Sequence, residues 1–118
     1  GPVVRRLVVC EAAIDALSFA ALDGARTTDT LYTSTAGGMG PDTEDAIRAH
    51  LRAMVRETGA SLVIATNNDK AGDRYAARLE GLAREAGVPC SRLVPAWGLN
   101  DFNDMLRRVV ADRATRAA

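Results

Sequence analysis

The sequence is poor in the residue types that mark several classes of protein. Aromatic residues make up only 4% of its 118 residues, so a core must be built mainly from Ala, Val, Leu and Ile. Two cysteines and one histidine cannot supply the four ligands of a structural zinc site. There is no apolar run of membrane-spanning length and no signal peptide at the N-terminus. We therefore expect a cytoplasmic protein without membrane contact, with Cys10 and Cys90 as reduced thiols in apolar core segments.

Neither positive nor negative charge is in excess. The 15 basic and 15 acidic residues cancel, which excludes an argument for nucleic-acid binding from bulk charge. Hydrophobic residues at 47% and charged residues at 25% are typical of a globular domain, and 118 residues fit one domain. Gly1 and Pro2 fit either a cloning remnant or the cut edge of a longer protein, and they carry no fold prediction.

Hydrophobic patterning predicts strands and helices in strict alternation. The first apolar run, Leu7 to Cys10, has no polar alternation, as in a strand buried on both faces of a parallel sheet. The predicted strands cover 5–10, 30–35, 62–66 and 88–94, and the predicted helices cover 12–22, 43–58, 71–86 and 101–110, with a fraying tail over 111–118. This order predicts a single α/β domain with about four parallel strands, right-handed crossovers and helices on both faces of the sheet.

Helical spacing also predicts which side chains are buried. In the first helix, a buried face of Ile14, Leu17, Ala21 and Leu22 is expected. The buried faces of the later helices are Ile47, Leu51, Met54 and Val55; Tyr75, Leu79, Leu82, Ala83 and Ala86; and Phe102, Met105, Leu106 and Val109. Trp97 lies in a loop, where it either packs the loop onto the sheet, the commoner role, or stacks on a base.

Acidic residues fall at the predicted carboxyl ends of strands or just beyond them. They are Glu11, Asp69 and the pair Asp101 and Asp104. If the first and third strands are neighbours, Glu11 and Asp69 face each other across a crevice where open α/β sheets bind ligands. Carboxylates in that position suit Mg²⁺, and Glu11 can serve as a general acid or base. Each acid also has a simpler interpretation, since Asp69 can be a turn residue and Asp101 or Asp104 can cap the last helix.

Three segments together resemble the Toprim domain, the catalytic module of bacterial-type primases, type IA and II topoisomerases and related nucleases. Glu11-Ala12-Ala13-Ile14-Asp15-Ala16-Leu17-Ser18 resembles the primase-like form Glu-Gly-x-x-Asp-Ala-Leu-Ser. The stretch from Thr66 to Asp73 resembles the Asp-x-Asp segment after the third strand. Gly98 to Leu106 is similar to the Lys-Asp-Trp-Asn-Asp segment of primase-like and mobilisation-associated members. The segments occur in the family's order and cover nearly the whole chain.

The resemblance implies a three-layer, Rossmann-like Toprim fold over residues 1–118, as one domain excised from a longer primase-like or plasmid mobilisation/replication protein. It implies a part in Mg²⁺- or Mn²⁺-dependent nucleotidyl transfer or phosphodiester cleavage. Glu11 and Asp69 are then the catalytic residues, and Glu11, Asp69, Asp101 and Asn67 are the metal ligands. The expected partners are DNA, nucleotides and other domains of the parent protein.

One departure bears on this prediction. The first acid of Asp-x-Asp is Asn67 here, which keeps an oxygen ligand but loses the charge. One metal held by Glu11 and Asp69 is therefore a safer expectation than two. Asn67 also favours an alternative, a catalytically degenerate module that binds nucleic acid or protein. A phosphoacceptor signalling domain would need an acidic pair after the first strand and a Lys after a late strand, and neither is evident.

Other polar groups are candidate phosphate contacts. Lys70 and Arg74 flank Asp69 in sequence, and Arg74 has an alternative as the ion-pair partner of Asp73. Gly37 and Gly38 follow the second strand, where backbone N–H groups can meet a phosphate, although a flexible connection is the simpler interpretation. His50 and the arginines at 48, 52 and 56 are expected on solvated helix faces.

Overall fold

The computed structural model describes residues 3–24 and 28–117, so Gly1, Pro2 and the last residue of the predicted tail lie outside it. Within these residues, four parallel strands form one sheet in the order β2-β1-β3-β4. The strands are β1 (Arg6–Cys10), β2 (Thr30–Ser34), β3 (Ser61–Ile64) and β4 (Cys90–Arg92). The predicted parallel α/β fold is confirmed, with strand ends within a few residues of those expected.

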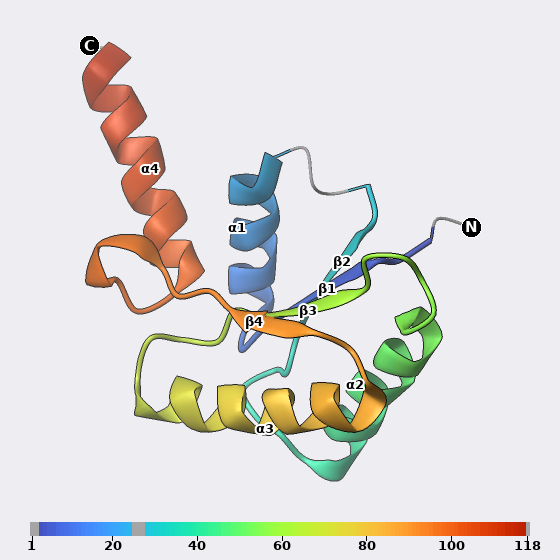
Figure 1. Ribbon diagram of the computed structural model, residues 1–118. Helices are drawn as coiled ribbons and strands as arrows, with labels where there is room; N and C mark the ends of the chain where they lie inside the picture. The colour runs from blue at the N-terminus through green and yellow to red at the C-terminus, as the bar shows by residue number, and fades with distance from the viewer. Residues whose placement is uncertain (1–2, 25–27, 118) are drawn as a thin grey trace.

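The helices form a layer on each face of the sheet. They are α1 (Ala13–Asp23), α2 (Pro41–Met54), α3 (Lys70–Ala86) and α4 (Phe102–Ala117), with a short 3-10 turn, η2 (Ala96–Gly98), before α4. Figure 1 shows α1 and α4 on one face and α2 and α3 on the other. None of these helices, in the part of the chain that is described, is both long and apolar enough to cross a membrane.

The central strand β1 connects the two layers of the core. Every residue of β1 is buried, as its unbroken apolar run predicts. Leu7 and Val9 pack with α2 and α3, whereas Val8 and Cys10 pack with α1 and α4. Because successive side chains of a strand point to opposite faces, one strand supplies both halves of the core.

An ion pair adds to the apolar packing between α2 and α3. Glu44 is buried on α2 and accepts two hydrogen bonds from the guanidinium of Arg78 on α3, at 2.9 and 2.7 Å. This paired geometry satisfies both oxygens of a carboxylate that would be costly to bury alone. The pair therefore fixes how α3 lies beside α2.

The predicted buried face of α1 is wrong for Ile14, Leu17 and Ala21, whereas Leu22 packs against the core as expected. Ile14 and Leu17 are exposed by 54% and 68%, and the buried residues are Asp15, Ala16, Ser18 and Phe19. The helix is turned so that its polar side chains meet α4, where Asp15 accepts a hydrogen bond from the backbone N–H of Asn103 at 3.1 Å. The observed face buries the ring of Phe19 and gives the buried carboxylate of Asp15 a hydrogen-bond partner, and it leaves Ile14 and Leu17 in solvent.

Three further expectations near the C-terminus are also wrong. The tail does not fray at 111, because α4 continues to Ala117 and projects from the body of the molecule (Figure 1). Trp97 does not pack the loop onto the sheet, since 57% of it is exposed. Cys90 is exposed on the short edge strand β4, whereas Cys10 is a buried free thiol as predicted. Because β4 has a neighbouring strand on one side only, fewer parts of the molecule surround its side chains, and Cys90 is left in contact with solvent.

Candidate metal centre

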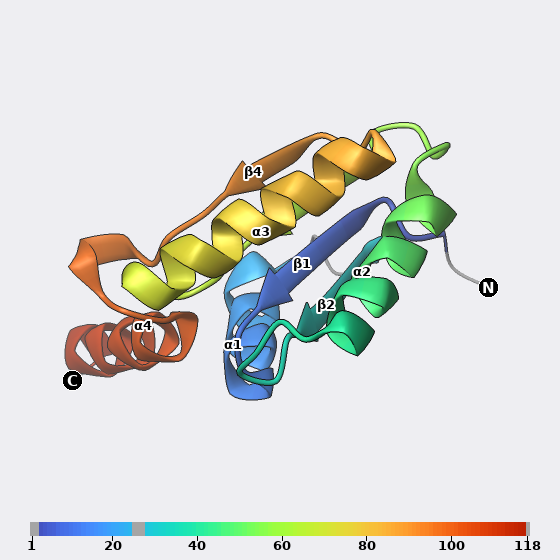
Figure 2. The ribbon, with the colours of Figure 1, turned by 90° about the horizontal axis from the view of Figure 1, so that it is seen from below.

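The carboxyl ends of β1 and β3 lie side by side at a switch point of the sheet. From β1 the chain crosses to β2 on one side, and from β3 it crosses to β4 on the other. Figure 2 shows the strand arrowheads pointing toward the end of the sheet where α3 begins. Ligands of open α/β sheets bind in the crevice outside such strand ends. β1 and β3 are neighbours, which is the condition under which Glu11 and Asp69 were expected to face each other.

Glu11 directly follows β1 and is only 9% exposed. Its Oε2 accepts a hydrogen bond of 2.5 Å from the backbone N–H of Asn67. Burial raises the pKa of Glu11, and the negative charges of Asp69 and Asp15 raise it further, while the Asn67 N–H and Arg92 act in the opposite direction. A carboxyl group whose pKa is raised in a crevice is suited to proton transfer nearer neutral pH.

Asp69 lies across the switch point and begins α3. Its Oδ1 accepts a hydrogen bond of 2.7 Å from the N–H of Gly72, which makes it the N-cap of the helix. Asp69 is therefore a turn residue, as one interpretation of the sequence expected. It also lies near Glu11, and the cap leaves its second carboxylate oxygen available. Asp69 is exposed, so a ligand can reach it.

The loop between β3 and α3 is held by its backbone. Gly72 packs so closely on Asn67 that a β-carbon at position 72 would lie 1.8 Å from the Asn67 carbonyl oxygen. The buried hydroxyl of Thr66 donates to the Gly72 carbonyl at 2.8 Å. Asn68 donates its N–H to the carbonyl of Asn100 at 2.7 Å. These contacts fix the position of Asn67 and join the loop to the segment before α4.

Arg92 is a residue of this region that the sequence did not reveal. It ends β4, next to β3, and its Nη2 donates to the Asn67 carbonyl at 2.9 Å while Nη1 pairs with Asp73 at 2.6 Å. Its Nε is buried and has no hydrogen-bond partner within the described residues. The only available signal was a charge at the end of a strand, and Arg92 lacked a motif. Asp73, the expected ion-pair partner of Arg74, therefore pairs with Arg92.

The other acids, Asp15, Asp101 and Asp104, gather at the start of α4. Asp101 caps α4, with its Oδ1 accepting the N–H of Asp104 at 2.8 Å, so the capping alternative is correct for Asp101. Burial raises the pKa of Asp15, as do the charges of Asp101 and Asp104, against the N–H of Asn103. Asp15 interacts with Glu11 as well as with Asp101 and Asp104, because its negative charge also raises the pKa of Glu11. The structure therefore places Asp101 near enough to Asp15 for their charges to interact, and Asp15 near enough to Glu11.

The candidate phosphate contacts differ in how accessible they are. Lys70 and Arg74 are exposed in the first turns of α3 and form no ion pair within the described residues. The N–H of Gly37 donates to the Glu11 carbonyl at 2.8 Å, and that of Gly38 donates to the Thr35 carbonyl at 3.3 Å. A phosphate at Gly37 and Gly38 would have to compete with these bonds.

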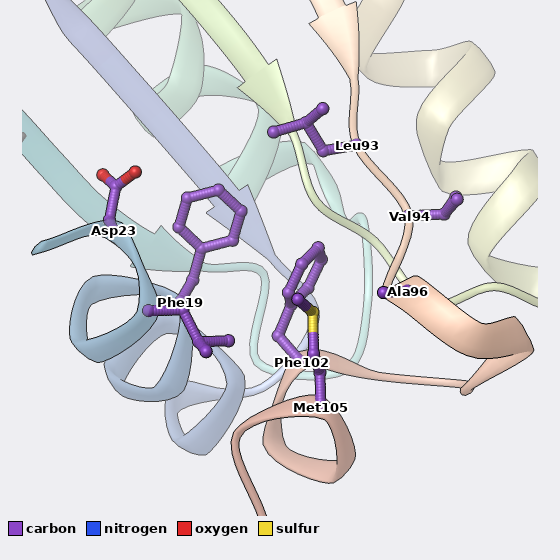
Figure 3. A pocket seen from close by; sticks show the side chains of 8 residues that line it. Phe19, Asp23, Leu93, Val94, Ala96, Phe102 and Met105 are labelled. Atoms are coloured by element: carbon purple, nitrogen blue, oxygen red, sulfur yellow. The ribbon is translucent and has the colours of Figure 1, made fainter. Parts of the chain in front are cut away.

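An apolar groove of about 230 Å³ lies away from these acids. Figure 3 shows the rings of Phe19 and Phe102 between α1 and α4, with Leu93 from the segment after β4 above them. Asp23 at its edge is bonded to Arg6 and Tyr32. None of the candidate metal ligands lines the groove, so it is a separate feature of the surface.

The donor chemistry at the switch point fits a hard divalent cation. Glu11 and Asp69 each use one carboxylate oxygen in a backbone hydrogen bond, and Mg²⁺ is commonly held by one or two carboxylates with water and phosphate oxygens completing its shell. Within residues 3–24 and 28–117, no group of three or more His, Cys, Asp or Glu side chains is arranged to hold a metal. The residues therefore fit one cation with two carboxylate ligands.

These features define an α/β domain with acidic side chains at the switch point of a parallel sheet. The family model described as Toprim-like matches residues 8–106. The chain belongs to the Toprim-like family, which confirms the family and the Rossmann-like fold predicted from the three motifs. Toprim domains generally bind divalent metal ions, and the family implies an interaction with nucleic acid. No curated protein matches the chain.

Proposed function

We propose that the domain is the Toprim catalytic module of a DNA primase-like or plasmid mobilisation/replication protein. It would support nucleotidyl transfer or phosphodiester cleavage that depends on Mg²⁺ or Mn²⁺, acting with other domains of its parent. The observation that carries this proposal is the position of Glu11, a nearly buried carboxyl group at the end of the central strand, across the switch point from Asp69.

Glu11 and Asp69 would hold the cation, with the side-chain oxygen of Asn67 as a third ligand and Asp101 in support. A bound divalent cation neutralises negative charge that develops on a phosphate group. Glu11 would hold or move a proton at its carboxylate. Lys70 and Arg74 would meet the phosphates of DNA or a nucleotide from the start of α3, where the helix dipole also favours anions.

Calorimetric titration of Mg²⁺ and Mn²⁺ tests the centre. Glu11→Gln and Asp69→Asn remove charge while keeping the hydrogen bonds to Asn67 and Gly72, since Gln can accept the first and Asn is a good N-cap. We expect each change to weaken metal binding by at least about tenfold, because losing even an outer-sphere partner of a metal has that effect.

Glu57→Gln is the matched control for these substitutions. Residue 57 follows the C-terminus of α2, which ends at the amino edge of the parallel strands, away from the switch point. Binding that is absent at millimolar metal, or equal in all four proteins, would refute a metal centre at Glu11 and Asp69.

A second candidate function is a degenerate Toprim module that binds nucleic acid or protein without catalysis. Asn67 favours it, because an amide supplies an oxygen but no charge to the cation. Asn67→Asp separates the two functions. If position 67 is a ligand of a working centre, the added carboxylate tightens Mg²⁺ binding; an unchanged affinity would mean that position 67 does not contact the metal.

A further inference from the structure

Trp97 and Arg108 form an exposed stacked pair beside the switch point. The guanidinium carbon of Arg108 lies 5.2 Å from the centroid of the Trp97 ring, within the range of a cation–π contact. More than half of Trp97 is exposed, as is about half of the Arg108 side chain. A large flat side chain thus lies at the surface in contact with an arginine and is not covered by the protein core.

The backbone at Trp97 is held in an unfavourable conformation. Its φ of 59° and ψ of 27° are left-handed, which costs an L-residue with a bulky side chain free energy that glycine would avoid. The turn is closed by a hydrogen bond of 3.2 Å from the N–H of Leu99 to the carbonyl of Ala96. The largest side chain of the sequence is therefore presented to solvent at a position where a small residue would be less strained.

The part of α4 beyond Asp101 and Asp104 is rich in arginine, although the whole chain is neutral. From Arg107 to Ala117, α4 carries four arginines, at 107, 108, 113 and 116, against a single aspartate, Asp112. Most of this stretch is exposed, and Figure 1 shows it extending away from the sheet. Asp112 forms an exposed ion pair with Arg108 at 3.4 Å. Exposed pairs of this kind are weak, so Arg108 remains open to a stronger anionic partner.

The segment that carries Trp97 is hydrogen-bonded to the loop that ends at Asp69. Asn68, in the loop that ends at Asp69, donates to the carbonyl of Asn100 and, through its side chain, to that of Leu99 at 3.5 Å. The segment that carries Trp97 thus lies next to the loop between β3 and α3. A single strand that reaches from the loop at Asp69 to this segment can meet the exposed ring of Trp97 and, farther along α4, its exposed arginines.

We propose that Trp97, Arg108 and the basic half of α4 bind single-stranded nucleic acid, with a base stacked on Trp97 and the arginines against the phosphates. Exposed aromatic faces combined with positive charge are how proteins hold single strands without reading their sequence. This inference rests on the proposed function in taking the bound strand to be the one handled at Glu11 and Asp69. Duplex DNA fits less well, because its bases are stacked on each other and cannot cover Trp97.

The sequence contains one tryptophan, so the fluorescence of Trp97 reports stacking directly. The probe is a single-stranded oligomer of about 20 deoxythymidines, added to the whole 118-residue chain in EDTA at low salt. We expect saturable quenching of Trp97 and little quenching by duplex DNA of equal length. An oligomer that binds by anisotropy but leaves the Trp97 fluorescence unchanged would overturn the proposal, and so would the absence of any binding.

Variants measured by anisotropy of a labelled oligomer complete the test. Trp97→Ala should weaken binding at least about fivefold, and Trp97→Phe should weaken it less, because a smaller ring still stacks. Arg108→Gln should weaken binding and reduce the slope of log K against log salt concentration by about 0.7, as expected for one lost phosphate contact. Arg52→Gln, on an exposed face of α2, is the matched control and should change neither.

Two results distinguish this proposal from others. If polyglutamate quenches Trp97 as strongly as the oligomer, the surface fits an acidic protein partner and the proposal is wrong. Because the titration contains EDTA, its outcome is independent of the metal calorimetry. Quenching without metal binding would refute only the metal centre, and metal binding without quenching would refute only the stacking surface.

Discussion

At position 72, the close approach of α3 to the loop leaves no room for a side chain. A β-carbon there would lie 1.8 Å from the Asn67 carbonyl oxygen and 2.6 Å from its carbonyl carbon. Both atoms belong to the backbone of Asn67, which is hydrogen-bonded to Glu11 and Arg92. Moving them aside would therefore disturb these hydrogen bonds. The glycine of the Asn67 to Asp73 motif is therefore a packing requirement of the candidate site.

We predict that Gly72→Ala destabilises the fold by about 3 kcal/mol or more. Overpacking typically costs about 1–3 kcal/mol, so this is the upper end of that range. The measurement is the free energy of unfolding from urea titration. Gly81→Ala is the matched control in the same helix, where a β-carbon meets nothing within 4 Å. It should instead stabilise by about 0.5–1 kcal/mol, since alanine favours helix. Equal stabilities of the two variants would contradict the close approach.

Single residues of the site were predictable from sequence only where a motif named them. Glu11 and Asp69 could be placed because a polar residue after a buried strand must emerge at the strand's carboxyl end. Arg92 could not, because nothing in its short strand separates a charge at the sheet edge from one beside the crevice. Asp15 stood in a motif, but its burial against Asn103 depends on where α4 docks, which local sequence does not determine.

At the scale of elements, α1 shows how an alanine-rich helix can be rotated. Ala12, Ala13, Ala16, Ala20 and Ala21 surround the helix with small apolar side chains, so several faces satisfy a helical period. The structure chooses the face with Phe19, whose ring packs edge-on against Phe102 at 4.8 Å between centroids. Asp15 and Ser18 share that face because Asn103 provides partners for both.

We predict opposite results for two substitutions on α1. Leu17→Lys should change the free energy of unfolding by no more than about 0.5 kcal/mol, because Leu17 is exposed. Phe19→Ala should cost about 3–5 kcal/mol, since it removes a buried ring. Thermal or urea denaturation of both variants decides between the two faces. A large loss for Leu17→Lys would restore the face predicted from spacing.

The order and type of the main elements were predictable, while their ends and outward faces were less so. Buried runs such as Leu7 to Cys10 and clear stripes such as Leu79, Leu82 and Ala83 define a strand and a helix by themselves. The length of α4 was underestimated because its last turns have no apolar side chain larger than alanine, and such a terminal sequence favours a frayed end. Trp97 was misplaced because a large aromatic residue is usually buried.

For the whole molecule, the buried acids make stability depend on pH. The pKa values of Glu11 and Asp15 are raised in the fold from the ordinary 4.5 and 3.8. Between those ordinary values and the raised ones, the folded state binds more protons than the unfolded state. Stability therefore falls as pH rises through this window, and the effect is complete above the raised pKa values.

We predict that Asp15→Asn reduces this decline. The amide oxygen can still accept the N–H of Asn103, but there is no proton to lose and no negative charge beside Glu11, Asp101 and Asp104. The measurement is the free energy of unfolding at several pH values from about 4 to 7. Glu57→Gln serves as the control, and a slope in Asp15→Asn as steep as in the unchanged protein would show that Asp15 does not contribute.

The order of the strands also determines when the sheet can form during folding. Arg6 of β1 lies opposite Thr30 on one side and Ser61 on the other, so the most buried strand has only partners distant in sequence. Such non-local parallel pairing slows folding. Until residues up to Ile64 have joined the sheet, Leu7 to Cys10 remain an apolar strand with an open edge, which is the kind of segment that aggregates. The strand that positions Glu11 is thus also the segment most exposed to misassembly while the chain is incomplete.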